Sequence, residues 1–168
     1  MAYDFATQLA KGKEVERKLD LFFADQFDRI EEVTMLYERK GIDRVYWKDG
    51  RSWDVEYKAD FKAHATGNFF AETVAYGTYE DGQFKTGKPG WVFTSQADIL
   101  IYVVMSPKEE EGLGTAYLAR PRDLRAWMDA WAERYRSVQV RNNGFQGRGL
   151  LVPLRELEKV SVIKIAIQ

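Results

Sequence analysis

The chain has 168 residues, of which 30% are charged, with a net charge of −1 at pH 7, no cysteine and one histidine. These figures exclude disulfides, thiolate metal sites, cysteine nucleophiles and zinc sites built from several histidines. No apolar run approaches the roughly 18 residues of a membrane span, and residues 1–11 lack the apolar core of a signal peptide. We therefore expect one cytoplasmic domain over residues 1–168, with no membrane partner.

The first third of the chain predicts a helix and then a hairpin. Apolar residues recur at helical spacing over residues 13–28, which predicts an amphipathic helix, whereas residues 29–41 are ambiguous. Two β-rich runs then surround Lys48-Asp49-Gly50, and Asp-Gly between such runs is a strong hairpin signal. By the strand period of two, the polar residues of the second run share one face of the strand: Asp54, Glu56 and Lys58.

The rest of the chain predicts further strands and a second long helix. Glycines punctuate residues 61–90, with a strand expected near Phe69–Tyr76, and the apolar run Ile99–Met105 predicts a buried central strand. Pro121 suits the first turn of a helix that runs to about Arg136. The smaller expected elements are a helical turn at Ser95–Asp98, an acidic loop at Ser106–Gly114, a strand at Tyr117–Ala119, a turn at Asn142–Gly144, a helical turn at Arg155–Glu158 and a closing strand at Val160–Ile167. The sum predicts an α/β or α+β fold around one mixed β-sheet flanked by helices.

Three residues at the predicted hairpin suit metal-assisted chemistry. Glu56 and Lys58 would lie side by side, roughly 6–7 Å apart along one strand, and Asp43 immediately precedes the partner strand. One carboxylate from each of two adjacent strands can hold Mg²⁺ or Mn²⁺, because such ions prefer oxygen ligands and keep several waters. A bound ion polarises a phosphate oxygen, and a neighbouring ammonium stabilises the developing charge. These residue types are sufficient for phosphodiester hydrolysis.

The order Gly41-Ile42-Asp43, then twelve residues, then Glu56-Tyr57-Lys58 resembles the Asp…Glu-x-Lys signature of the PD-(D/E)XK nuclease superfamily. Upstream, Gly12-x-x-x-Glu16 resembles the helix that supplies an extra acidic ligand in Holliday-junction resolvases of that superfamily, with Glu14 as the alternative register. The resemblance implies a restriction-endonuclease-like core in which Asp43, Glu56 and Glu16 hold the metal and Lys58 is catalytic. The chain departs from the signature at Ile42, where the proline of the superfamily name is absent, and at Tyr57, where an aliphatic residue is usual.

A narrower likeness extends from about residue 12 to residue 105 and concerns a phage and prophage branch of small endonuclease-like proteins. The segments that carry this likeness are Glu56-x-Lys58-x-Asp60, Ala65-Thr66-Gly67-Asn68, Glu72, Gly90-Trp91 and Ala97-Asp98.

Several further residues have both a functional and a structural interpretation. Glu72 joins the metal site, braces a basic side chain or is a surface acid; Asn68 is a turn residue or contacts a phosphate or water; and Gln96 is a candidate contact of the active-site water or of DNA. Asp98 is expected to cap a helical turn. Arg120, Arg122, Arg125 and Arg148 are candidate DNA phosphate contacts, with solvated surface charge as the alternative.

The leading hypothesis is a Mg²⁺-dependent DNA endonuclease, with branched or structured DNA as candidate substrates. A homodimer is expected if the resolvase likeness holds, because a junction presents two symmetric strands. The net charge of −1 counts against a nucleic-acid partner. Two alternatives stay open: a non-catalytic nucleic-acid-binding module with the nuclease fold, and a phage accessory protein that binds other proteins.

Overall fold

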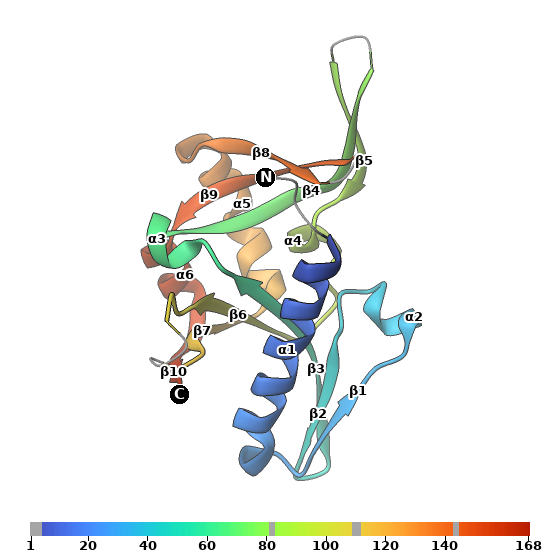
Figure 1. The fold of residues 1–168 in the computed structure, drawn as a ribbon, viewed down its shortest axis with the longest axis vertical. Helices are drawn as coiled ribbons and strands as arrows, with labels where there is room; N and C mark the ends of the chain where they lie inside the picture. The colour runs from blue at the N-terminus through green and yellow to red at the C-terminus, as the bar shows by residue number, and fades with distance from the viewer. Residues whose placement is uncertain (1–4, 81–82, 109–111, 143–144) are drawn as a thin grey trace.

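The computed structural model of the chain describes residues 5–80, 83–108, 112–142 and 145–168, in which the strands form two sheets (Figure 1). The central sheet has the order β1 (Arg29–Glu32), β2 (Arg44–Lys48), β3 (Arg51–Asp60), β6 (Ile99–Met105), β7 (Gly114–Ala119) and β10 (Ser161–Ile167). The second, antiparallel sheet has the order β5 (Gln83–Pro89), β4 (Asn68–Glu80), β9 (Phe145–Pro153) and β8 (Ser137–Asn142). In the central sheet β3 and β6 run parallel and the other neighbours are antiparallel, so the expected mixed sheet is confirmed.

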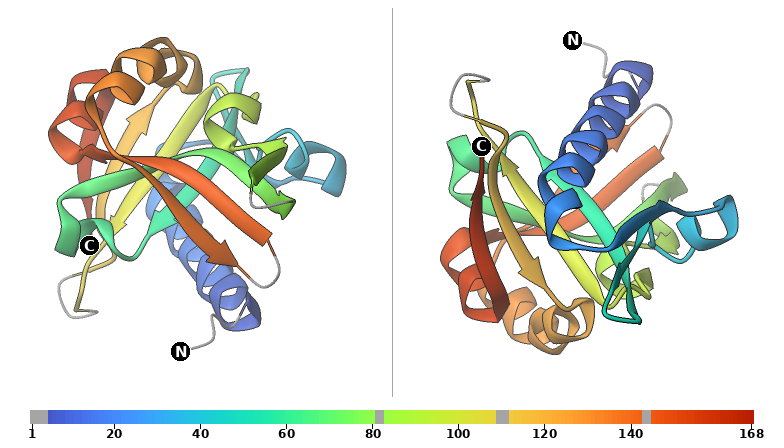
Figure 2. Two further views of the ribbon diagram at one scale, coloured as in Figure 1. Left: turned by 90° about the horizontal axis from the view of Figure 1, so that it is seen from above. Right: turned by 90° about the horizontal axis from the view of Figure 1, so that it is seen from below.

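Helix α1 (Phe5–Phe23) covers one face of the central sheet, and α5 (Pro121–Arg134) and the second sheet cover the opposite face (Figures 1 and 2). The expected flanking helices are therefore confirmed, although α1 begins before residue 13 and its α-helical part ends at Phe23. The remaining helical segments are short: η1 (Ala24–Gln26), α2 (Met35–Glu38), α3 (Ala63–Thr66), α4 (Trp91–Thr94) and α6 (Leu154–Val160).

Strand β6 is buried on both faces, as its continuous apolar sequence predicts. Leu100 and Tyr102 belong to the core shared with the second sheet and α5, whereas Ile101 and Val103 belong to the core beneath α1. In the parallel register Glu56 pairs with Leu100, and Lys58 pairs with Tyr102. Because paired residues point to the same face of a sheet, Glu56 and Lys58 face the second sheet, away from α1.

The β2–β3 hairpin has the predicted turn. Asp49 has φ 51° and Gly50 has φ 72°. Positive φ at both central residues is typical of the two-residue type I′ turn, whose twist matches that of the flanking strands. This turn fixes the register of the hairpin, in which Arg44 pairs with Val55.

Several elements differ from the expectation of one sheet. Residues 29–41 contain β1 and α2, and the expected strand at Phe69–Tyr76 is part of the longer β4 in a second sheet. The expected helical turn at Ser95–Asp98 is wrong, since α4 ends at Thr94 and Ser95 is extended. The expected loop residues Glu109–Glu111 and the turn residues Asn143-Gly144 lie outside the described part of the chain.

Candidate active site

The hairpin places Asp43 directly beside Glu56. The backbone N–H of Asp43 donates to the carbonyl of Val55 at 2.8 Å, one residue out of the register in which Arg44 pairs with Val55. The Asp43 carboxylate in turn accepts a hydrogen bond from the backbone N–H of Tyr57 at 2.7 Å. The structure therefore brings together the two carboxylates that the sequence paired.

Glu56 is a buried acid with an incomplete set of partners. Its residue is 1% exposed, and its Oε1 atom lies 2.7 Å from Nζ of Lys58, whose side chain is 32% exposed. Among the described residues, the buried Oε2 atom of Glu56 has no hydrogen-bond partner. Leaving a buried polar atom without a partner costs about 1–3 kcal/mol, and more for a charged group. Such an atom is suited to a ligand that supplies positive charge.

The surroundings perturb the pKa values of both members of this ion pair. Burial raises the pKa of Glu56, and the nearby Asp43 adds to this rise, while Lys58 offsets part of it. Burial alone would lower the pKa of Lys58, but attraction to Glu56 and Asp43 outweighs it and leaves that pKa raised. Lys58 is therefore a permanent cation at neutral pH.

Glu72 joins the cluster from the second sheet. Its Oε2 atom accepts a hydrogen bond from the backbone N–H of Trp91 at 3.3 Å. Burial raises the pKa of Glu72, and this pKa is also raised by Glu56, whereas the Trp91 N–H and Lys58 lower it. Three carboxylates, those of Asp43, Glu56 and Glu72, thus lie around Lys58. Glu72 is therefore placed at the site.

Two close approaches hold the segments around Glu56. Gly41 has φ +69°, and a Cβ atom at this position would lie 3.1 Å from Cα of Ser95 and 3.2 Å from Oε1 of Glu56. The Ser95 hydroxyl donates to the carbonyl of Gly41 at 3.4 Å. No local sequence pattern indicates Ser95, because its contact with Gly41 depends on the packing of two segments that are 54 residues apart.

The donor set at this site fits a hard divalent cation in chemistry. Carboxylate oxygens are the ligands that Mg²⁺ and Mn²⁺ prefer, and two carboxylates with water suffice. Over the ranges described above, no three Asp, Glu, His or Cys side chains gather closely enough to hold an ion together. The residues that could hold a cation are therefore the adjacent pair Asp43 and Glu56, with its partnerless Oε2 atom.

The structure does not bring Glu16 into this cluster. Glu16 lies on α1, beyond the opposite face of the central sheet, and its carboxylate is 3.0 Å from Lys13 and 3.3 Å from Arg44. The alternative, Glu14, pairs with Arg17 at 2.9 Å. The expected third metal ligand from this helix is not in place, because the buried Arg44 occupies the Glu16 carboxylate.

Asn68 and Asp98 have structural roles. The Asn68 side chain donates to the carbonyl of Thr66 at 2.7 Å, and Asn68 is four residues, roughly 13 Å along a strand, from Glu72. The Asp98 carboxylate accepts a hydrogen bond from the backbone N–H of Asp54 at 3.0 Å, so the expected helix cap is wrong. Asp98 instead fastens the start of β6 to β3.

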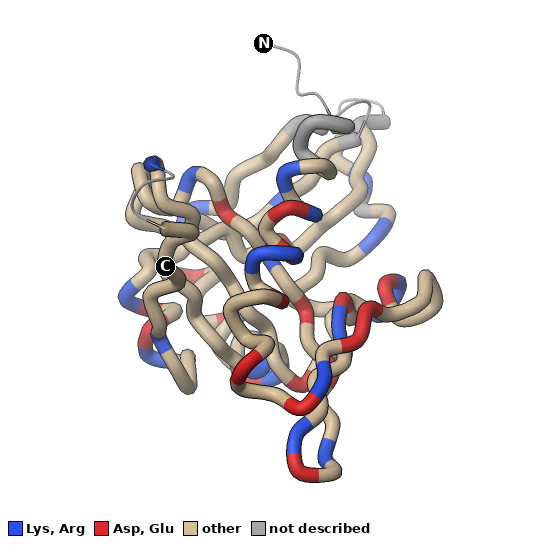
Figure 3. Tube along the Cα trace, turned by 60° about the horizontal axis from the view of Figure 1, so that its bottom comes forward, with Lys and Arg blue, Asp and Glu red and all other residues tan. Residues whose placement is uncertain are grey.

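The candidate DNA-contacting residues fall into two places. Gln96 and the arginines Arg120, Arg122 and Arg125 line a pocket of about 590 Å³ beside the start of α5. Arg148, on β9, stacks over the ring of Phe84 with its guanidinium carbon 4.1 Å from the ring centroid. Basic and acidic residues alternate over much of the described chain, without one continuous basic face in this view (Figure 3).

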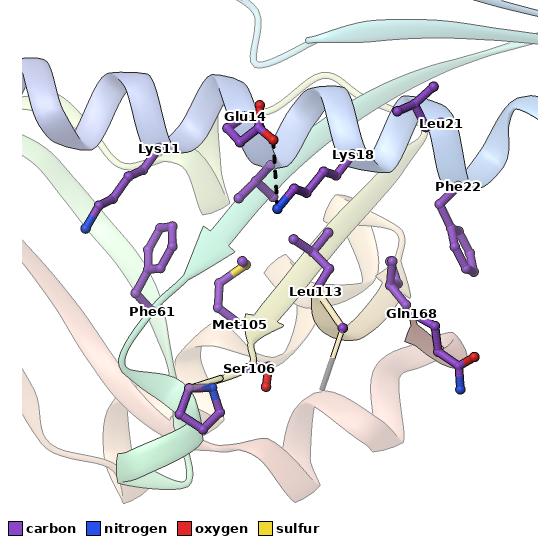
Figure 4. A pocket seen from close by; sticks show the side chains of 14 residues that line it. Lys11, Glu14, Lys18, Leu21, Phe22, Phe61, Met105, Ser106, Leu113 and Gln168 are labelled. Atoms are coloured by element: carbon purple, nitrogen blue, oxygen red, sulfur yellow. Dashed lines mark ion pairs between the residues drawn. The ribbon is translucent and has the colours of Figure 1, made fainter. Parts of the chain in front are cut away.

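A second pocket, of about 780 Å³, lies on the α1 side of the central sheet (Figure 4). Lys11 and Lys18 of α1 line it together with Phe61, Met105 and Leu113, and Lys18 pairs with Glu14 at 3.8 Å. Asp43, Glu56, Lys58 and Glu72 do not line this pocket. This pocket is therefore separate from the carboxylate–lysine cluster.

Comparison of the chain with models of known protein families, with curated proteins and with solved structures found no match. Within the described ranges, no helix is both long and apolar enough to cross a membrane. The restriction-endonuclease-like core and the superfamily membership remain predictions from the sequence motifs.

Proposed function

We propose that this protein is a metal-dependent DNA endonuclease whose reaction centre consists of Asp43, Glu56 and Lys58. The observation that carries the proposal is the buried Glu56 carboxylate, which lies beside Asp43 and Lys58 and leaves Oε2 without a donor among the described residues. A purely structural ion pair would gain by satisfying that atom, whereas a ligand-binding carboxylate needs it available.

In this proposal Asp43 and Glu56 hold Mg²⁺ or Mn²⁺, and Glu72 adds negative charge behind Lys58. The bound ion supplies polarisation of a phosphate oxygen and a water ligand of lowered pKa. Because the pKa of Lys58 is raised, its ammonium stays protonated and stabilises the charge that develops on the phosphate, rather than accepting a proton. We place this activity in the cytoplasm of a bacterial or phage-infected cell, with structured or branched DNA as candidate substrates and a homodimer as the form that would cut a junction.

The test is cleavage of supercoiled plasmid, linear duplex, nicked duplex and a four-way junction, each with Mg²⁺, Mn²⁺ or EDTA. The wild type is expected to cut at least one of these substrates only with a metal ion. Glu56→Gln and Lys58→Ala are expected to lose about 100-fold or more in rate, as when a group that stabilises transition-state charge is removed. Circular dichroism should show both variants folded.

Matched controls separate the site from general charge effects. Glu133→Gln and Lys18→Ala alter exposed residues of α5 and α1 and should retain the wild-type rate. Glu16→Gln also tests the resolvase likeness, since the observed ion pair with Arg44 predicts retained cleavage. Loss of cleavage in folded Glu16→Gln would show that this acid reaches the metal.

Two results would overturn the proposal. Absence of metal-dependent cleavage together with salt-sensitive DNA binding would identify a non-catalytic nucleic-acid-binding module. Absence of both, with a stable protein partner, would identify an interaction module.

A further inference from the structure

The pocket of about 590 Å³ beside the start of α5 has two chemically different walls. One wall, the floor of the pocket, is apolar. It consists of Trp53, Leu118 and Ile163, on the α1-side face of the central sheet. Ile163 is 50% exposed, although it is a large aliphatic residue on a sheet. We name this cavity the arginine pocket after its other wall.

That other wall carries Arg120, Arg122 and Arg125. Arg120 is held by Asp123 at 2.6 Å, and Arg125 donates to the backbone carbonyls of Val92 and Ser95 at 3.2 and 3.0 Å. Arg122 differs from both, because its side chain is 70% exposed and its ion pair with Asp123 is 3.7 Å long. That distance is too long for a hydrogen bond, so Arg122 offers its donors to a ligand.

The charge of this wall favours an anion. Three arginines line the pocket with one carboxylate, Asp98, while Asp123 pairs with Arg120 and Asp54 lies close enough to Asp98 to feel its charge. The Asp98 carboxylate accepts the backbone N–H of Asp54, which engages part of its negative charge. An apolar floor with an indole and a cationic wall match a ligand that has a flat ring at one end and a phosphate at the other.

We propose that the arginine pocket binds one unpaired nucleotide of a nucleic-acid strand, with its phosphate on Arg122 and its base on Trp53 and Ile163. The volume lies within the range of small-molecule sites, which is roughly 300–1,000 Å³. This inference rests on the proposed function, in that the strand held here continues to the reaction centre.

The pocket and the reaction centre share one segment of chain. Gln96 lines the pocket, and the preceding Ser95 lies against Gly41, which approaches Oε1 of Glu56. Arg125 belongs to the pocket wall and also holds the carbonyl of Ser95. The pocket floor lies on the α1-side face of the central sheet and Glu56 faces the second sheet, so a bound strand would pass around the Ser95–Gln96 segment to reach both, which would favour substrates with an unpaired strand.

The test is titration of ¹⁵N-labelled, metal-free protein in EDTA with 5′-phosphorylated trithymidylate, followed by NMR. The indole N–H signal of Trp53, assigned with Trp53→Phe, and the amide signals of Gln96, Arg122 and Ile163 are expected to shift together. Arg122→Ala should weaken binding by about 10-fold, which corresponds to the loss of one charge-assisted phosphate contact. Arg134→Ala, which alters another exposed arginine of α5, should bind as the wild type does.

Four results would overturn the inference. Equal affinity of the Arg122→Ala and Arg134→Ala proteins would remove the phosphate contact. Shifts with inorganic phosphate as large as those with the trinucleotide, without a Trp53 response, would show anion binding alone. Shifts that depend on protein concentration without ligand would show that a second copy covers the pocket. Shifts elsewhere only would place the strand on another surface.

Because metal is absent, this test is independent of cleavage. Nucleotide binding without any metal-dependent cleavage would leave the pocket assigned and the proposed endonuclease overturned. Cleavage with unchanged binding by Arg122→Ala would retain the endonuclease and reject the pocket.

Discussion

Burying a carboxylate lowers the free energy of unfolding, and Glu56, which is 1% exposed, is buried in this way between Asp43 and Lys58. Lys58 compensates one oxygen, while the other has no donor among the described residues. Residues that lower stability in this way concentrate at functional sites, where the strain serves binding or catalysis. The charge of Glu56 should therefore be unfavourable in the metal-free protein.

Glu56→Gln is expected to stabilise the metal-free protein by roughly 1–3 kcal/mol at pH 8 and by less at pH 5. Burial raises the pKa of Glu56 above its ordinary value of 4.5, so the folded chain binds this proton more tightly than the unfolded chain does. The penalty of the charged form is therefore absent below the unfolded pKa and develops as the pH rises through the folded pKa. Urea denaturation of the wild type and Glu56→Gln in EDTA at both pH values measures this change in the free energy of unfolding.

Glu133→Gln is the matched control, since this exposed residue should change stability by less than about 0.5 kcal/mol. A lower stability of Glu56→Gln at both pH values would mean that the charge of Glu56 serves the fold, contrary to our expectation.

At the scale of residues, the sequence predicts which side chains lie near Glu56 only where one hairpin joins them. The Asp-Gly turn sets the register, so the proximity of Asp43 and Glu56 follows from local rules. Glu72 and Ser95 reach Glu56 through the packing of distant segments, which no local pattern specifies. For Glu16, the buried Arg44 competes successfully for its carboxylate.

At the scale of elements, the four-residue helix α4 has an influence larger than its length. The Trp91 N–H at its first turn donates to Glu72, and Ser95 just after it packs against Gly41 beside Glu56. Arg125 holds the carbonyls of Val92 and Ser95 from behind. The position of α4 therefore sets two of the three carboxylates.

Gly90, directly before α4, makes this placement possible. A Cβ atom at Gly90 would lie 2.2 Å from the backbone oxygen of Glu72, whereas one at Gly12, within α1, would meet nothing within 4 Å. Gly90→Ala is expected to destabilise the protein by about 2 kcal/mol or more, because backbone must move. Gly12→Ala should stabilise it by roughly 0.5–1 kcal/mol through helix propensity.

Thermal unfolding of both alanine variants measures these opposite effects. If Gly90→Ala unfolds at the wild-type temperature, then α4 is not packed against β4 as described. If Gly12→Ala is strongly destabilising, Gly12 serves a close contact that the described structure lacks.

Three strands that the sequence did not predict, β5, β8 and β9, belong to the second sheet. The register of β4 shifts between Glu72 and Val74 and again between Val74 and Gly77. Such bulges interrupt the alternation of apolar and polar residues on which strand prediction depends. By contrast, β6 and the β2–β3 hairpin have unbroken patterns, and both were predicted with their correct neighbours in sequence.

For the whole molecule, the central sheet and the second sheet both contribute to the carboxylate–lysine cluster. Asp43, Glu56 and Lys58 come from the central sheet, and Glu72 comes from the second. A cation bound between the carboxylates should therefore stabilise the entire folded chain rather than one hairpin.

Mn²⁺ at about 100 times its dissociation constant is expected to add roughly 2.7 kcal/mol to the free energy of unfolding, which follows from binding to the folded state alone. The increase should appear as a higher melting temperature by calorimetry, and EDTA should reverse it. Glu56→Gln should show little of this increase, and Glu133→Gln all of it. Equal shifts in both variants would place the ion elsewhere.

The pairing of β4 with β9 also has a consequence for the order of events during synthesis. A nascent chain that has reached the end of β6 already contains Asp43, Glu56, Lys58 and Glu72. At that stage β4 has only β5 to pair with, and an isolated two-stranded hairpin is marginal in water. Its partner β9, at Phe145–Pro153, emerges from the ribosome later. Glu72 therefore joins Asp43, Glu56 and Lys58 only near the end of translation, so under the proposed function an incomplete chain would lack the complete site.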